Sequence, residues 1–306
     1  MTSALAATAP AIARSMQLTL SPFRYGSTDP TTWLGPHEFV RATLTPDGPG
    51  TLRITWHGDG GNAQNLDVTA WGDGAEWLLG RVGAYTGADD VAVELPDLHP
   101  TVTRAARDHP GLRLGASGSL YHELLPTIIA QRITSGEALR QWRRLCLELG
   151  APAPGPFARL RLPPTPETLA RRPSWWFHPL GIEVKRARAI TEMASHAHRL
   201  WEWAAAGADV VAARLALIRG VGQWTIGSVL GPALGDPDAV AVGDYHLANM
   251  VAWSLAGEPR ATDDRMLELL EPFRGQRGRV IRLIGLSGAG VPAFGPRKRI
   301  LPMHRW

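Results

Sequence analysis

The residues best suited to chemistry lie between Leu217 and Trp253. Gly220-Val221-Gly222 separates two stretches of helical spacing, and Asp244 follows within Val-Gly-Asp-Tyr-His-Leu. Glycines permit a tight reversal, and the amides opening the next helix have no intrahelical partner and suit a phosphate. A carboxylate beside bound substrate can stabilise positive charge or activate water. We therefore predict a phosphate grip next to a reactive carboxylate. The alternatives are a hairpin that packs only on itself and an N-cap role for Asp244.

Helices must position these groups, because apolar residues recur with helical spacing from Ser119 onward. Leu120, Leu124, Leu125, Ile128 and Ile129 form one apolar face, with Ser119 as the expected N-cap. Further helices are expected at Ser135–Leu149, Pro166–Arg171, Glu183–Trp203, Ala208–Ile218, Gln223–Leu234, Asp244–Leu255, Asp263–Leu270 and Gly278–Leu286.

The preceding part of the chain has short alternating runs that are typical of strands. These runs are Met16–Leu20, Phe39–Leu44, Leu52–Trp56, Leu66–Ala70 and Val91–Leu95, and a helix is expected at Ala75–Tyr85. The predicted fold class is α+β, with a small sheet-and-helix domain before a mainly helical one. We expect a disordered tail at 1–15, an α+β domain at 16–110, a helical domain at 111–290 and a basic tail at 291–306.

Charge is divided unevenly along the 306 residues. Residues 1–110 carry 7 Lys and Arg against 12 Asp and Glu, whereas residues 111–306 carry 25 against 16. A basic helical part favours a polyanionic partner, although a solvated basic surface would have the same composition. Only Lys185 and Lys298 are lysines, which limits any chemistry that needs an amine.

Several classes of protein are excluded by composition. No run of 18 apolar residues occurs, so no transmembrane helix is expected. The Ala-rich start has its first basic residue, Arg14, after the apolar run, unlike a signal peptide, so we expect a cytoplasmic protein. Cys146 is the only cysteine, which excludes an internal disulfide and a four-cysteine iron–sulfur or zinc site. The histidines show no metal-ligand spacing.

The hairpin and its aspartate together resemble the helix-hairpin-helix (HhH-GPD) DNA glycosylase superfamily. The resemblance rests on Leu217-Ile-Arg-Gly-Val-Gly-Gln-Trp-Thr225 and Val242-Gly-Asp-Tyr-His-Leu247. His109–Leu114, Leu125–Thr134 and Leu180–Ile190 are similar to segments of the bacterial DNA-3-methyladenine glycosylase II subfamily, as is the first domain. The resemblance covers residues 16 to 286. It implies two helical subdomains with the active site in the cleft between them.

The resemblance also implies roles for individual residues. Asp244 would be the catalytic carboxylate, and Trp224 and Tyr245 would belong to the base pocket. An aromatic face suits a base made cationic by alkylation, so damaged, alkylated purines are the expected substrates. Ile226-Gly-Ser228 and the Gly/Arg-rich stretch Arg274–Arg282 stand where relatives tend to have pocket aromatics. That departure favours a wider or more polar pocket and leaves the lesion open.

Double-stranded DNA is the implied partner, and the protein is expected to act as a monomer at the bacterial nucleoid. Its expected contacts are Arg219, Gly220, Val221, Gly222, Gln223 and Thr225 of the hairpin, Gln131 and Arg132 of the wedge loop, and Lys185 and Arg186. Either Gln131 or Arg132 would fill the gap left by an extruded base. The carbonyls of Ile218 and Gly220 are a possible cation site, as in some relatives, and no cofactor is required.

The lyase reaction of some family members uses a lysine two residues beyond the last hairpin glycine. Trp224 occupies that position here, so the resemblance predicts a monofunctional enzyme that leaves an abasic site. Two alternatives remain open: a non-catalytic DNA-binding protein that keeps the hairpin, and a glycosylase for oxidised or deaminated bases.

Overall fold

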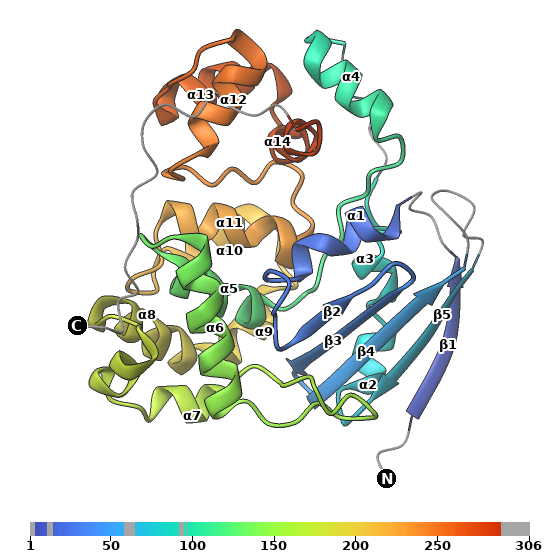
Figure 1. Ribbon diagram of the computed structural model, residues 1–306, viewed down its shortest axis with the longest axis vertical. Helices are drawn as coiled ribbons and strands as arrows, with labels where there is room; N and C mark the ends of the chain where they lie inside the picture. The colour runs from blue at the N-terminus through green and yellow to red at the C-terminus, as the bar shows by residue number, and fades with distance from the viewer. Residues whose placement is uncertain (1–3, 11–14, 58–64, 92–94, 96, 289–306) are drawn as a thin grey trace.

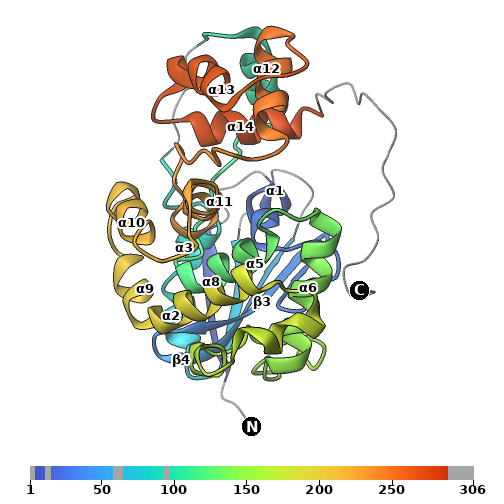
Figure 2. The same cartoon turned by 90° about the vertical axis from the view of Figure 1, so that its left-hand side faces the viewer.

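The computed structural model describes residues 4–10, 15–57, 65–91, 95 and 97–288. Figures 1 and 2 show a sheet on one side, a body of helices against it, and a smaller group of helices above both. The strands are β1 (Ala4–Pro10), β2 (Thr32–Leu34), β3 (Glu38–Thr45), β4 (Gly48–Trp56) and β5 (Asn65–Trp71). They form one antiparallel sheet in the order β1-β5-β4-β3-β2. The expected α+β class is confirmed.

Helices make up most of the remaining described chain. They are α1 (Met16–Leu20), α2 (Ala75–Leu79), α3 (Val82–Tyr85), α4 (Pro100–Asp108), α5 (Leu120–Ala130), α6 (Ser135–Leu149), α7 (Pro166–Ala170), α8 (Val184–Ser195), α9 (Ala197–Trp203), α10 (Ala208–Leu215), α11 (Gln223–Leu234), α12 (Leu247–Ala256), α13 (Asp263–Leu270) and α14 (Arg277–Leu286). Short 3-10 helices are η1 (Ser21–Phe23), η2 (Ser174–Leu180) and η3 (Glu271–Phe273).

The structure corrects two expectations about the first 20 residues. Residues 4–10, expected in a disordered tail, form β1 and pair with β5 from Ala4 opposite Trp71 to Pro10 opposite Asn65. Residues 16–20, expected as a strand, form α1, which is capped by the Ser15 side chain. Within α1, Met16, Thr19 and Leu20 are buried, which is the spacing of a helix face.

Other boundaries differ in detail. The expected helix Glu183–Trp203 is divided at His196 into α8 and α9, and Ala75–Tyr85 is divided into α2 and α3. Helix α4 was not expected. The strand expected at Val91–Leu95 falls mostly outside the described residues, as does the basic tail at 291–306. Ser119 caps α5 as expected, since its hydroxyl accepts from the His122 amide at 3.2 Å.

Three apolar clusters lie at the centres of the three groups of elements. One fills the space between the sheet and α1–α3, and a second packs the helical body from α5 to α11 against β3. The third joins α4 to α12–α14, where Val102 packs with Val251, Met266 and Ile284. The upper helices therefore form a cap with its own core, assembled from two separate parts of the chain.

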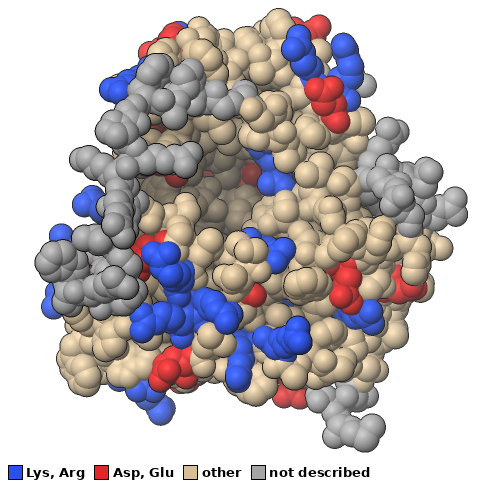
Figure 3. All heavy atoms as spheres, viewed as in Figure 1, with Lys and Arg blue, Asp and Glu red and all other residues tan. Residues whose placement is uncertain are grey.

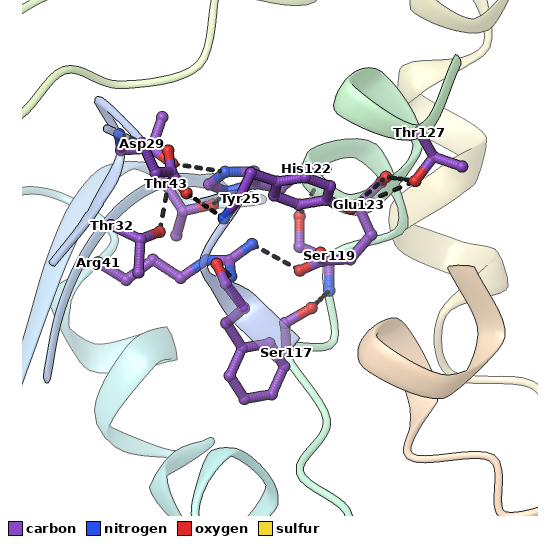
Figure 4. Close-up of polar contacts among 12 residues, drawn as sticks. Tyr25, Asp29, Thr32, Arg41, Thr43, Ser117, Ser119, His122, Glu123 and Thr127 are labelled. Atoms are coloured by element: carbon purple, nitrogen blue, oxygen red, sulfur yellow. Dashed lines mark hydrogen bonds and ion pairs between the residues drawn. The ribbon is translucent and has the colours of Figure 1, made fainter. Parts of the chain in front are cut away.

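Buried polar contacts join the sheet to the helical body (Figure 4). Arg41 on β3 pairs with Glu123 on α5 at 2.5 Å, and both side chains are fully buried. The His122 ring lies between two hydroxyls, with Nδ1 2.8 Å from Thr43 Oγ1 and Nε2 3.2 Å from Thr31 Oγ1. Burial, together with the charge of Arg41, lowers the pKa of His122 well below its usual value. These contacts fix how α5, which leads to the wedge loop, sits on the sheet.

Candidate active site

The hairpin lies between α10 and α11. Gly220 has a φ of +91°, and a Cβ there would lie 2.6 Å from Ala189 Cβ, so a side chain is excluded on both grounds. Gly222 is the N-cap of α11, and a Cβ there would meet no atom within 4 Å. Gly222 and Gln223 are both exposed at the start of α11, where the first amides have no partner within the helix. Those amides are the ones an anion would bind.

Exposure separates the hairpin residues that were expected to contact DNA. Arg219, Gly220, Gly222 and Gln223 are exposed. Val221 is 6% exposed and its amide donates to the Ile218 carbonyl at 3.0 Å, so neither group is free for a phosphate. Val221 therefore secures the turn from inside, which corrects the expectation that it contacts DNA.

Gln131 ties the wedge loop to the hairpin. Its side-chain amide donates to the Gly220 carbonyl at 2.8 Å and to Thr225 Oγ1 at 2.9 Å. Thr225 is itself buried, so its hydroxyl serves this contact and does not face a ligand. The same bond bears on the candidate cation site, because the Ile218 and Gly220 carbonyls both already accept hydrogen bonds. Each carbonyl oxygen keeps a second lone pair, so a cation there would share these oxygens with the N–H groups of Val221 and Gln131.

Arg132 is the exposed member of the wedge loop. Its φ of +57° places it in the left-handed region, and no other non-glycine residue of the described chain has a positive φ. Such a conformation costs on the order of 1–3 kcal/mol and persists where the surroundings impose it. Within the described residues its side chain has no hydrogen-bond or ion-pair partner. Of the two wedge candidates, Arg132 is therefore the one free to enter DNA.

Asp244 lies on the segment between α11 and α12 rather than in the first turn of α12. Its Oδ1 accepts from the amides of His246 at 2.9 Å and Leu247 at 3.0 Å, so it caps the start of α12. Its Oδ2 accepts from Nε1 of Trp224 on α11 at 3.1 Å. Three donors, from α11 and from the start of α12, therefore hold the Asp244 carboxylate. The cap uses Oδ1 alone, and Oδ2 contacts Trp224.

A cavity of about 370 Å³ opens beside this carboxylate. Figure 3 shows a deep hollow between the cap helices and the body, with acidic and basic side chains on its walls. The cavity walls come from Thr19 and Pro22 near α1, residues 113–115, Gly227, Gly231 and Pro232 of α11, Asp236, Ala239, Ala241, Asp244 and His246 of the following segment, and Leu247, Met250, Gly278, Ile281 and Arg282 of α12 and α14. Asp244 lies in this wall, between the two groups of helices.

The two aromatic residues expected in the pocket do not line it. Trp224 instead directs its indole N–H at Asp244. Tyr245 is 86% exposed and stacks edge-on against His246, outside the cavity. Leu217, at the start of the hairpin, is 81% exposed. Tyr245 and Leu217 are therefore apolar surface beside the site rather than pocket walls.

Sequence reasoning placed the stretch Arg274–Arg282 at the pocket, but it singled out none of the three charged residues Arg113, Asp236 and Arg282 that line the cavity. Arg282 donates through Nη2 to the Leu18 carbonyl and to Ser21 Oγ, which joins α14 to the α1–η1 segment. Burial lowers the pKa of Arg282 and raises that of Asp236, since both lose solvation. Arg113 donates to the Asp90 carbonyl at 2.6 Å. Residues that are far apart in the sequence and meet only after folding leave no local pattern that would indicate their contact.

Arg186 is buried and does not meet DNA, contrary to expectation. It is 1% exposed, and its Nη1 donates to the Ile129 carbonyl at 2.6 Å and to Gln141 Oε1 at 2.7 Å. It therefore binds the end of α5 to α6 and α8, just before the wedge loop. Lys185 is exposed on α8.

A basic surface lies below the hollow in Figure 3. Helix α6 contributes the exposed Arg140, Arg143 and Arg144, which sequence reasoning did not single out, and Arg132 precedes that helix.

Among the described residues, no cluster of three or more His, Cys, Asp or Glu side chains could hold a metal ion. In the same residues no helix is long and apolar enough to cross a membrane.

Solved structures with this arrangement are DNA glycosylases of the helix-hairpin-helix type. The 3-methyladenine DNA glycosylase of Archaeoglobus fulgidus aligns over 92% of this chain and 98% of its own, with a TM-score of 0.74 and 17% identity. The 8-oxoguanine glycosylase/lyase of Clostridium acetobutylicum aligns over 93% and 98%, with a TM-score of 0.66 and 11% identity. Its complex with double-stranded DNA aligns over 93% and 96%, with a TM-score of 0.65 and 11% identity. No protein-family model and no curated protein matches the sequence. The chain therefore has the fold of these glycosylases.

Proposed function

We propose that the protein is a monofunctional DNA glycosylase of base-excision repair. The observation that carries the proposal is the Asp244 carboxylate, held by three donors in the wall of a cavity beside a hairpin with open helix-N-terminal amides. A cavity that size suits an extruded base. The fold shared with the Archaeoglobus and Clostridium enzymes supports the same reaction class.

In this proposal, some residues would bind the DNA backbone and Asp244 would take part in the chemistry. The amides of Gly222 and Gln223 and the exposed Arg219 would bind a backbone phosphate and set the register of the DNA. Arg132 would fill the space of the extruded nucleotide. Asp244 would stabilise positive charge developing at C1′ as the base departs, and would orient the water that adds to C1′ and loses a proton.

No lysine occurs among the described residues that line this wall, which supports a hydrolytic reaction without strand cleavage. A lyase step needs a nitrogen nucleophile that forms a Schiff base with the sugar. Trp224 occupies the position where the resembled lyases carry lysine, and Lys185 lies on the exposed side of α8. The expected product is an intact strand with an abasic site.

The test uses duplexes that each carry one defined damaged base, with half of every sample treated with alkali. Breaks that depend on alkali support monofunctional base release, whereas breaks without alkali contradict it. Asp244→Asn should abolish release while the amides of His246 and Leu247 keep an acceptor. The matched control is Asp264→Asn, which alters an exposed acid in the first turn of α13.

The same samples test the alternative of a binding protein without activity. Binding that weakens steeply with salt is expected for a phosphate grip. Tight binding with no release from any lesion, unchanged by Asp244→Asn, would favour the non-catalytic alternative. Alkylated purines, the substrates expected from Trp224, belong in the panel as one class among several.

A further inference from the structure

We propose that Gln131 is a positioning residue that holds the wedge residue Arg132 at a fixed place relative to the hairpin, so that phosphate binding and wedge insertion act together. The inference rests on the proposed glycosylase function and adds a residue that would act through Arg132 rather than on the base. The sequence left Gln131 and Arg132 as alternative wedges. Their contacts in the structure give them two different roles.

The Gln131 side chain joins the wedge loop to both parts of the hairpin. Its Nε2 donates to the Gly220 carbonyl at 2.8 Å and to Thr225 Oγ1 at 2.9 Å. Gly220 belongs to the turn and Thr225 to the first turn of α11, so one amide group bridges the whole phosphate-binding element. An amide nitrogen has two hydrogens, and both are used here. A Gln131 side chain that entered the DNA would have to break both bonds.

The backbone on each side of Arg132 is held in place. On the α5 side, Arg186 Nη1 donates to the Ile129 carbonyl at 2.6 Å, two residues before Gln131. On the α6 side, the Thr134 carbonyl accepts from two amides in the first turn of α6, both at 3.0 Å. Arg132 connects these fixed segments with a φ of +57°, which is unfavourable for a residue with a side chain. We therefore expect this conformation to relax when the Gln131 bonds are removed.

Arg132 has the freedom that a wedge needs. Its side chain is exposed and makes no hydrogen bond or ion pair within the described part of the chain. A guanidinium can stack on a base and can also donate to a phosphate. The first amides of α11 determine where a backbone phosphate binds. Because Gln131 bonds to that same element, the position of the phosphate also determines where Arg132 meets the DNA.

The first test measures wedge insertion without base release. It compares the affinity for a duplex that carries one tetrahydrofuran abasic analogue, whose empty space a wedge fills, with the affinity for the same duplex lacking the analogue. Wild type should prefer the abasic duplex. Gln131→Met should lower this preference by about 10-fold or more, as expected for losing two hydrogen bonds between neutral groups, and should leave the affinity for the intact duplex unchanged.

Two further variants bracket this result. Thr225→Val removes one of the two acceptors and should lower the preference by less than Gln131→Met does. The matched control is Gln17→Met, because the Gln17 amide also donates to a glycine carbonyl, that of Gly35, at 3.0 Å, where α1 meets the end of β2. Gln17→Met should keep the wild-type preference. An unchanged preference in Gln131→Met, or an equal loss of affinity for both duplexes, would overturn the inference.

The second test asks whether Gln131 acts through Arg132. Arg132→Ala should lower the preference by itself, and adding Gln131→Met should lower it little further, because the residue to be positioned is already gone. Additive losses would show that Gln131 contacts the DNA on its own, and would overturn the positioning role. A wild-type protein with no preference for the abasic duplex would overturn it as well.

These results are separate from those that test the proposed function. Release of a damaged base by wild type, together with an unchanged preference in Gln131→Met, would leave the glycosylase function intact and reject the positioning role. No release from any lesion, together with the expected losses of preference, would reject the glycosylase function and leave the coupling between hairpin and wedge standing.

Discussion

Trp224→Phe tests how the carboxylate is held. The replacement keeps an aromatic side chain but removes the N–H that donates to Asp244 Oδ2 at 3.1 Å. A hydrogen bond to a charged group contributes about 1.5–3 kcal/mol, and about 1.4 kcal/mol changes a rate tenfold. If the full contribution acts on the orientation of Asp244, base release should slow by about 10- to 150-fold. The two amide contacts to Oδ1 should keep α12 in place.

The assay is single-turnover base release, with the protein in excess over the damaged duplex and at a saturating concentration. A positioning role predicts a slower maximal rate with nearly unchanged DNA affinity, because Trp224 does not line the cavity. The matched control is Trp175→Phe, at a tryptophan that is 70% exposed on η2, and it should leave the rate unchanged. A Trp224→Phe protein with the wild-type maximal rate would refute the reasoning. Weaker binding of the base without a slower maximal rate would instead return Trp224 to the role of a stacking residue.

Two further predictions concern the buried contacts between the sheet and α5. Glu123→Gln leaves the fully buried Arg41 without a countercharge, so the free energy of unfolding should fall by about 3–5 kcal/mol. Replacing Arg41 by Met and Glu123 by Leu together should recover most of this loss. Equal urea midpoints for wild type and Glu123→Gln would contradict the prediction. Burial lowers the pKa of His122 in the folded protein. Below pH about 6.5, the His122 ring is therefore protonated in the unfolded chain but stays neutral in the folded protein. Stability should therefore decline by up to about 1.4 kcal/mol per pH unit on acidification, and the decline should be smaller in His122→Gln.

The sequence predicted best those helices and strands whose conformation follows from the pattern of apolar residues within the element itself. Helices α11 and α13 have the expected bounds, and β3, β4 and β5 contain the expected strands, because apolar residues recur at one period along each. Met16–Leu20 was misassigned because five residues satisfy both periods: positions 16, 18 and 20 alternate, while 16, 19 and 20 form the buried face of a helix. Residues 4–10 carry little strand signal of their own and become a strand by pairing with β5.

The hairpin and the position of Asp244 close to it could be predicted from the sequence, and most of the cavity wall around Asp244 could not. The hairpin glycines and Asp244 lie close together in sequence, so their spacing is informative. Arg282 reaches the Leu18 carbonyl beside the cavity only because α14 packs near α1, which no local pattern in the sequence indicates. Arg186 shows the opposite error: a basic residue in a basic run was expected on the surface, but the carbonyl at the end of α5 and Gln141 bind it inside.

Strand β1 protects an edge of the sheet, so removing it would affect the solubility of the protein without removing any residue of the site. It covers one edge of the sheet, and its partner β5 would become the edge if β1 were removed. A protein that began at Met16 would keep every residue of the hairpin, the cavity and the cap. It would also expose the unpaired amides and carbonyls of β5, which recruit strands from other molecules. Precipitation of such a truncated protein would therefore report sheets joining edge to edge, with the chemistry of Asp244 untouched.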